Sequence, residues 1–204
     1  MGAVTVSRQY GAGGLRFAPA LAEALGYRFV DREIVEEGAR RLGLDPKLAS
    51  ERDERAPAVV EEIGLALAQG TPELGLSPVR TDDAKLAEEV RSVIVALADA
   101  GGYVILGRGG QAALRGRPDV VHLSLVGDRA DRVLRVRERQ GLSEREAAAR
   151  CERVDADRAA YVRRFYGADI RDPTLYDCVV NTSTLGIEGA LEVALAACRR
   201  KLGR

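Results

Sequence analysis

Lysine is scarce in this sequence. Of its 31 basic residues only Lys47, Lys85 and Lys201 are lysines, so the other 28 are arginines. Any cationic chemistry of the protein therefore falls to guanidinium groups, whose forked donors suit phosphate oxygens. Because such a bias can also follow from genome composition, it does not by itself indicate a site.

Cysteine and histidine are also sparse. Cys151, Cys178 and Cys198 are scattered, odd in number and without C-x-x-C spacing, which argues against a disulfide framework and a zinc site. They lie in apolar patterns, and we interpret them as small hydrophobic residues in a reducing compartment. His122 alternates with apolar neighbours in a predicted strand, so we expect it to be structural and not catalytic.

The sequence has no net charge, no apolar run of 18 residues, and no signal peptide, repeat or low-complexity segment. Its 31 acidic residues balance the basic ones, and its pI is about 6.6. We therefore expect a cytoplasmic protein with neither nucleic acid nor a membrane as partner. A chain of 204 residues, 46% apolar and 30% charged, predicts one globular domain over residues 1–204.

Short apolar strands alternate with amphipathic helices along most of the chain. The strands are predicted at residues 4–7, 27–30, 103–106, 120–126 and 178–181. This alternation predicts parallel βαβ units, and so a three-layer α/β fold with a mostly parallel sheet and helices on both faces. We expect an irregular insertion or flap at 44–83 and an arginine-rich helical lid at 129–166, in which Ser143 and Glu146 form a capping box.

The first predicted strand runs directly into the glycine-rich turn Gly11–Gly14. Such a turn lets backbone amides surround a phosphate at the positive end of the next helix, although a tight turn without a ligand has the same pattern. The usual loop, G-x-x-x-x-G-K-[ST], would place Gly, Lys and Ser or Thr where this chain has Arg8, Gly14 and Leu15. A helix terminus stabilises an anion by only about 0.3–2 kcal/mol. A triphosphate therefore also needs Mg²⁺ or cations, for which Arg8 and Arg16 are the local candidates.

Two further turns also follow predicted strands. Asp31-Arg32 ends the second strand, and Gly107-Arg108-Gly109-Gly110 follows the third. Ligands of parallel sheets bind beyond the carboxyl ends of the strands, so we expect these turns and the first loop to converge on one edge. Asp31 and Arg32 can hold a substrate, or they can be a helix cap beside an exposed arginine. Arg108 can face a ligand between its glycines, or it can belong to an ordinary left-handed turn.

Residues 129–164 contain eleven arginines and seven acidic residues, a local charge of +4. Such a segment is either a solvated, salt-bridged helix pair or a hinged lid whose arginines close over a transferring phosphate. Within it we single out Arg153 and Arg158. The spacing Asp155-x-x-Arg158 places an acid and a base on neighbouring turns of one helix.

Four segments together resemble the cytidylate kinase-like family, which has the nucleoside-monophosphate kinase fold of the P-loop nucleoside triphosphate hydrolase superfamily. These segments are VSRQYGAGG at 6–14, LGYRFVDREI at 25–34, VILGRGG at 104–110 and YDCVVNTSTLGIEGA at 176–190. The likeness runs nearly end to end and is weakest across 44–83. It implies a three-layer P-loop kinase fold with a helical lid and a small helical insertion.

The resemblance implies transfer of the γ-phosphoryl group of ATP, with Mg²⁺, to a nucleoside monophosphate, most directly CMP or dCMP. The first loop, Gly11, Ala12, Gly13 and Gly14, would bind the ATP phosphates, and we expect Arg8 or Arg16 to supply the missing charge. Catalysis would consist of positioning and charge neutralisation, with no covalent nucleophile.

The acceptor nucleotide is implied to contact residues of the later segments. These are Asp31 with Arg32, Arg108, and the lid pair Asp155 and Arg158, while Arg153 would neutralise charge from the lid. No metal ligand can be assigned to any residue.

The sequence departs from the family pattern at three places. Gly14 takes the place of the phosphate-loop lysine, and Gly109 takes the place of an aspartate that follows Gly-Arg in the family. Arg32-Glu33 replaces the Thr-Gly that follows the acid at the end of the second strand. These departures leave two alternatives open: a kinase of a different small acceptor, and a nucleotide-binding sensor without catalysis.

Overall fold

The computed structural model describes residues 1–43 and 81–203. The insertion expected at 44–83 lies outside the described residues, except that 81–83 begin a helix. The chain divides into two compact units, one of residues 1–31 with those from 94 onward, the other within 32–93.

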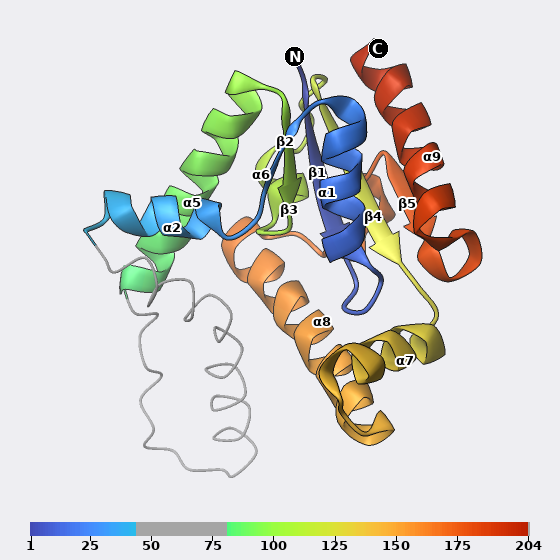
Figure 1. The fold of residues 1–204 in the computed structure, drawn as a ribbon. Helices are drawn as coiled ribbons and strands as arrows, with labels where there is room; N and C mark the ends of the chain where they lie inside the picture. Colours follow the sequence, from blue (N-terminus) through green and yellow to red (C-terminus); the bar gives the residue numbers. More distant parts are fainter. Residues whose placement is uncertain (44–80, 204) are drawn as a thin grey trace, which may run out of the picture. The chain divides into compact units, whose positions relative to one another are not determined.

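The larger unit contains a five-stranded parallel sheet. Its strands are β1 (Ala3–Arg8), β2 (Arg28–Val30), β3 (Tyr103–Leu106), β4 (Val120–Val126) and β5 (Cys178–Asn181), in the order β2-β3-β1-β4-β5. Because all neighbours pair in parallel, the carboxyl ends of β2, β3 and β1 lie next to one another (Figure 1). The predicted α/β fold and every predicted strand are confirmed.

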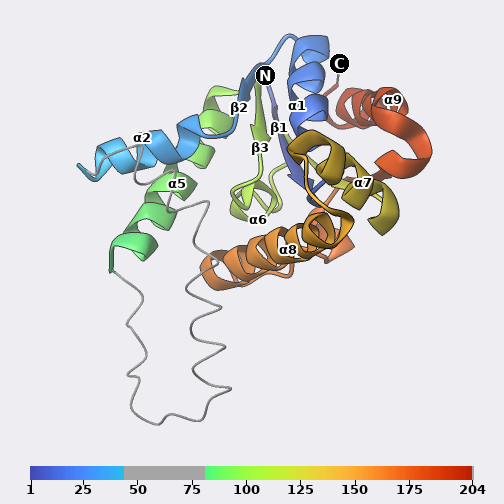
Figure 2. The ribbon, with the colours of Figure 1, turned by 60° about the horizontal axis from the view of Figure 1, so that its bottom comes forward.

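Helices cover both faces of this sheet. They are α1 (Gly14–Leu25), α6 (Gly110–Ala113), α7 (Arg129–Gln140), α8 (Glu144–Tyr166) and α9 (Thr182–Leu202), with a 3₁₀ turn at Pro173–Leu175. Helices α1 and α9 lie on one face, while α7 and α8 lie beyond the carboxyl ends of the strands (Figures 1 and 2). The short α6 and the 3₁₀ turn were not predicted, because four and three residues are too few to show a helical period.

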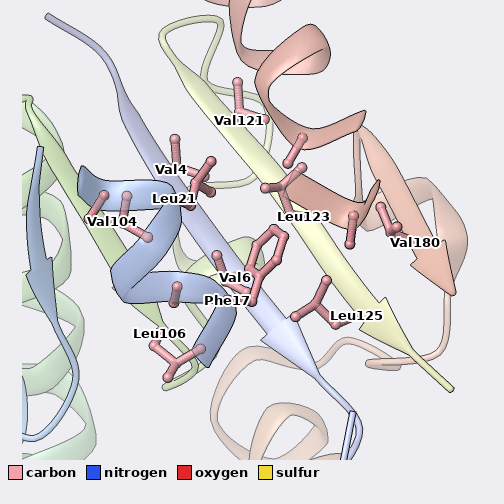
Figure 3. Packing of buried hydrophobic residues seen from close by; sticks show 14 of the residues in the cluster. Val4, Val6, Phe17, Leu21, Val104, Leu106, Val121, Leu123, Leu125 and Val180 are labelled. Carbon is pink, nitrogen blue, oxygen red and sulfur yellow. The ribbon is translucent and has the colours of Figure 1, made fainter. Parts of the chain in front are cut away.

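The core between the sheet and α1 follows from the alternation of side chains along β1. Val4 and Val6 point toward α1, where Phe17 and Leu21 are completely buried (Figure 3). Burial of a side chain of this size contributes about 1.5–3 kcal/mol. This packing fixes the start of α1, and with it the loop that joins β1 to α1.

The alternate residues of β1 face the other side of the sheet, where the layer is polar. The Thr5 hydroxyl lies 2.7 Å from Nδ1 of His122, whose Nε2 lies 3.3 Å from the Leu114 carbonyl. Since a carbonyl can only accept, Nε2 carries the proton and Thr5 donates to Nδ1. Burial lowers the pKa of His122, so a neutral, hydrogen-bonded histidine agrees with the structural role expected for it.

Local signals set most helix ends. Gly26 (φ 66°) ends α1, and Ser143 with Glu146 forms the predicted capping box at the start of α8. Pro19 lies inside α1, where it removes one helical hydrogen bond. Helix α9 begins at Thr182, ahead of the predicted apolar stripe, with a kink at Gly186.

The smaller unit pairs α2 (Glu33–Arg41) with the first part of α5 (Thr81–Ala100). A Cβ on Gly38 would lie 3.3 Å from Val90 Cγ2, so the two helices approach closely there. All three cysteines are free, as expected. Among the described helices none is both long and apolar enough to cross a membrane.

Candidate phosphate-binding site

The loop between β1 and α1 contains two positions that only glycine fits. Gly11 (φ 81°) and Gly13 (φ 86°) adopt left-handed backbone conformations. A Cβ would lie 2.6 Å from the Arg132 carbonyl oxygen at Gly11, and 2.5 Å from Ile187 Cδ1 at Gly13. Both the backbone angle and the close neighbours therefore require glycine at these positions.

The amides of this loop are available to a ligand. Tyr10 N–H donates to Asp155, and Ala12 N–H donates to the Gln9 carbonyl. The amides of Gly11, Gly13, Gly14 and Leu15 donate to no acceptor within residues 1–43 and 81–203. They surround the amino terminus of α1, where an anion is favoured by the free N–H groups and by the helix dipole.

Helices α7 and α8 hold the loop through a partly buried ion pair. Arg132 of α7 and Asp155 of α8 lie 2.7 Å apart, with side chains 11% and 27% exposed. The other carboxylate oxygen of Asp155 accepts from the Tyr10 amide at 2.7 Å, and Arg132 donates to the Tyr10 and Gly127 carbonyls at 3.0 and 2.9 Å. Asp155 therefore binds the loop backbone in this structure.

A second set of contacts joins the loop to the start of α9. Thr182 is buried, and its hydroxyl lies 3.0 Å from the Ala12 carbonyl and 3.1 Å from that of Val126. Arg135 of α7 donates to the Thr182 carbonyl at 3.2 Å and approaches the Gly11 carbonyl at 3.4 Å. The loop is thus held by α7, α8 and α9 together.

Three arginines gather beside the loop. Arg158 donates to the Arg8 carbonyl at 2.9 Å and lies over the Tyr10 ring. Arg108 pairs with Asp31 at 3.8 Å, with both side chains more than four-fifths buried. Burial, and after it the charge of Arg158, lowers the pKa of Arg8 to about 9, while Asp31 acts in the opposite direction. Arg8 remains a cation at neutral pH.

The turn after β3 is shaped by an aromatic ring. Arg108 adopts a left-handed conformation (φ 56°), and its carbonyl accepts from the Tyr166 hydroxyl at 3.1 Å. A Cβ on Gly109 (φ 71°) would overlap Cε2 of Tyr166. An aspartate at this position, where the resemblance places one after Gly-Arg, would therefore have to displace the ring and adopt a left-handed backbone conformation.

The structure brings most of the predicted site residues together, but not all. Arg8, the glycine loop, Asp31, Arg108, Asp155 and Arg158 lie at the carboxyl ends of β1, β2 and β3. Arg16 and Arg153 are exposed on α1 and α8, and Arg32 precedes α2 in the smaller unit. No position relative to the site is assigned to Arg32.

Sequence reasoning missed the residues that hold the loop. Tyr10, Arg132, Arg135 and Thr182 were not singled out, although Arg132 carried a signal. It lies on the same face of α7 as the buried Val133 and Val136, where an arginine is out of place unless it has partners.

The chain matches the family model described as "Cytidylate kinase-like family" over residues 3–184. The chain belongs to the cytidylate kinase-like family. A cytidylate kinase from Ignicoccus hospitalis is 30% identical over 198 residues, which are 94% of this chain and 96% of that protein. A uronate isomerase from Corynebacterium glutamicum is 26% identical over 139 residues, which are 68% of this chain but only 26% of that protein.

Solved structures agree on the fold. An uncharacterized protein from Eubacterium ventriosum has a TM-score of 0.69 and 19% identity, with 96% of this chain and 97% of that one covered. A gluconokinase from Sinorhizobium meliloti has a TM-score of 0.53 and 16% identity, with 98% and 92% covered. The chain therefore has a P-loop kinase-like fold and belongs to a family of kinase-like phosphotransferases.

Proposed function

We propose that the protein transfers the γ-phosphoryl group of ATP to a nucleoside monophosphate, with CMP or dCMP as the first candidates. The observation that carries this proposal is the group of amides of Gly11, Gly13 and Gly14, which have no acceptor among the described residues, beside the guanidinium groups of Arg8, Arg108 and Arg158. Phosphoryl transfer needs little covalent chemistry from a protein, but it needs fixed donors around a phosphate.

The ATP phosphates fit the first loop. The amides of Gly11, Gly13 and Gly14 have no acceptor among the described residues, and Arg132 and Asp155 bind the loop backbone, so little reorganisation is needed when the anion binds. Of the two local cations named from the sequence, Arg16 is exposed and Arg8 is partly buried beside the loop. We assign the charge of the missing lysine to Arg8.

The acceptor fits on the neighbouring strands. Asp31 and Arg108 lie where β2 and β3 end, and Arg158 reaches the same place from α8. An acceptor phosphate between Arg108 and Arg158 would lie next to the donor loop. We keep Arg153 in the proposal as a lid cation, since an exposed side chain of α8 is free to turn toward a bound nucleotide.

Mg²⁺ would supply charge neutralisation on the ATP phosphates. Mg²⁺ commonly takes most ligands from substrate phosphates and water. This fits the described residues, which contain no group of three acidic, histidine or cysteine side chains, and a loop in which Leu15 offers no oxygen. Both oxygens of Asp155 already accept hydrogen bonds, from Tyr10 and Arg132. Asp31, which pairs with Arg108 at 3.8 Å, is the other carboxylate assigned to the site, and it is the one we would test as a metal partner.

A different small acceptor is the second candidate. It is favoured by Gly109 and the Tyr166 ring, which replace the aspartate expected after Gly-Arg. Purified protein with ATP, Mg²⁺ and a panel of nucleoside monophosphates tests both candidates. Formation of ADP and a nucleoside diphosphate is the expected result. Turnover only with non-nucleotide acceptors would favour the second candidate, and ATP binding without any turnover would favour a sensor.

The same assay should depend on the guanidinium of Arg158. We expect Arg158→Met to lower kcat/KM by about 10²-fold or more, as removal of a charge-stabilising donor does in other enzymes. Arg150→Met is the matched control, because Arg150 is exposed on the same helix. Equal activity of both variants would remove Arg158 from the proposed site.

A further inference from the structure

Two residues that depart from the usual phosphate loop, Arg8 and Gly14, contact each other. The side chain of Arg8 crosses Gly14, where a Cβ would lie 2.9 Å from Arg8 Cγ and 3.3 Å from its Cβ. Arg8 takes the place of the first glycine of the usual loop, and Gly14 that of its lysine. A lysine at position 14 and an arginine at position 8 would therefore compete for the same space.

The guanidinium end of the Arg8 side chain lies against a second glycine, Gly107. A Cβ on Gly107 would overlap Nη1 of Arg8 and lie 3.1 Å from its Cζ. Gly107 follows β3 and Gly14 begins α1. Because neither glycine has a side chain, space remains between the two turns for the side chain of Arg8. The guanidinium therefore leaves the donor loop and ends at the turn that carries Arg108.

The guanidinium of Arg8 has charge neighbours but no acceptor. It donates no hydrogen bond within the described part of the chain, and the charges acting on it are those of Arg158, Asp31 and Arg108. Asp155, which faces Arg158, is paired with Arg132. Among the described residues, the guanidinium groups of Arg8, Arg108 and Arg158 act on one another at this place, where a dianionic phosphoryl group would find several charge-assisted donors.

We propose that Arg8 replaces the phosphate-loop lysine from the opposite end of the loop, reaching across Gly14 to Gly107, and there binds the phosphoryl group that is transferred. This inference rests on the proposed function and adds to it the position of the cation. The group that Arg8 contacts is the terminal phosphate of the donor, at the point where the donor loop and the turn after β3 meet.

Nucleotide binding without turnover tests the proposal. Affinities of Arg8→Met, which keeps the length of the stem, would be measured by calorimetry for ADP and for a non-hydrolysable ATP analogue. We expect the affinity of the variant to fall about tenfold or more for the ATP analogue and less than about threefold for ADP. Only the analogue carries the terminal phosphate. Arg150→Met should change neither affinity. Equal losses for both ligands, or no loss for either, would overturn the proposal.

The melting temperature of the ligand-free variant is a second, independent readout. A guanidinium that lies among like charges without an acceptor costs stability, so Arg8→Met should melt at or above the wild-type temperature. A lower melting temperature would mean that Arg8 supports the fold, and would contradict the proposal.

A double-mutant cycle tests the crossing at Gly14. Gly14→Ala should weaken binding of the ATP analogue about tenfold when Arg8 is present, because the new methyl group displaces the Arg8 stem. In an Arg8→Ala background the same change should have almost no effect, and additive effects would contradict the proposed path.

The outcomes also separate this inference from the proposed function. If the wild type transfers a phosphoryl group but Arg8→Met keeps the wild-type preference between ADP and the ATP analogue, only the inference would be overturned. Arg8-dependent binding of the ATP analogue without transfer to any acceptor would overturn only the enzymatic part of the proposed function. A wild-type protein that binds neither nucleotide would overturn both.

Discussion

Asp155 shows how one carboxylate can connect separate parts of the site. It accepts from the Tyr10 amide and pairs with Arg132, which in turn donates to the loop carbonyl of Tyr10. The family resemblance directs this residue toward the acceptor, whereas in the structure it contacts the loop between β1 and α1 and pairs with Arg132. We therefore treat it as a positioning residue of the loop as well as a candidate catalytic residue.

Asp155→Asn should reduce the free energy of unfolding by about 1–3 kcal/mol, because it leaves the buried Arg132 without its counter-charge. Urea unfolding at neutral pH would measure this loss. The control is Glu152→Gln, which breaks the exposed Arg129–Glu152 pair between the same two helices and should cost much less, because solvent screens an exposed pair. Similar losses in the two variants would mean that the buried pair does not hold the loop.

Because of His122, the free energy of unfolding should decrease at acidic pH. Burial lowers the pKa of His122 in the folded state, whereas in the unfolded chain it titrates near about 6.5. Below that pH the unfolded state binds more protons than the folded state, so stability is fully present above about pH 6.5 and falls as the pH decreases. The nearby charges, Lys201 and Asp177, form an ion pair at 2.7 Å.

Urea unfolding of the wild type and of His122→Gln between pH 7.5 and pH 5.5 would check this. We expect the wild type to lose stability over this interval and the variant to lose less, although the variant starts from a lower value. An equal slope in both proteins would show that His122 is not the responsible group.

Among the elements, the turn from β3 to α6 is fixed by a partner far away in the sequence. Gly109 follows a short apolar strand, and this local pattern alone permits many residues. The ring of Tyr166, at the end of α8, lies where the side chain of residue 109 would be, and its hydroxyl binds the Arg108 carbonyl. Helix α8 therefore sets the course of the turn that carries Arg108.

Gly109→Ala should destabilise the protein by about 1–2 kcal/mol more than Gly116→Ala. Both glycines have a positive φ, but a Cβ at Gly116 meets no atom within 4 Å, whereas at Gly109 it meets the Tyr166 ring. The difference in urea unfolding free energy between the variants measures the ring contact. Equal costs would show that Tyr166 can move away freely.

At the scale of the whole molecule, the loop and helices α7, α8 and α9 form one hydrogen-bonded group. Arg132 and Arg135 of α7, Asp155 and Arg158 of α8, and Thr182 of α9 all bind backbone atoms between Arg8 and Ala12. Ligand binding at the loop should therefore change the dynamics of α7 and α8 as well as those of the loop.

Hydrogen exchange with and without an ATP analogue would measure this coupling. We expect the amides of residues 11–15 to become protected, together with those of α7 and α8, while the central strands β1 and β4 change little because they already exchange slowly. Protection confined to the loop would mean that the lid helices do not respond to the donor nucleotide.

Local pattern was sufficient for most of the fold. Several patterns act over only a few residues, so the sequence shows them directly. They are the period of two in residues such as Val4 and Val6, the helical stripe ending at Leu25, and the capping pair Ser143 and Glu146. The glycine loop and the Asp31 and Arg108 turns were found for the same reason. Parallel strand pairing then brings those turns to one edge.

The sequence by itself determined the alternating α/β order, the phosphate-loop position and the absence of a lysine there. Only the tertiary structure decided which of the described arginines lie beside the loop, since Arg132 and Arg158 lie more than 120 residues from the backbone atoms that they bind. It also decided why Gly14 and Gly107 are glycines, because the Arg8 side chain occupies the space beside both. Such choices depend on distances across the fold, which no local spacing of residue types encodes.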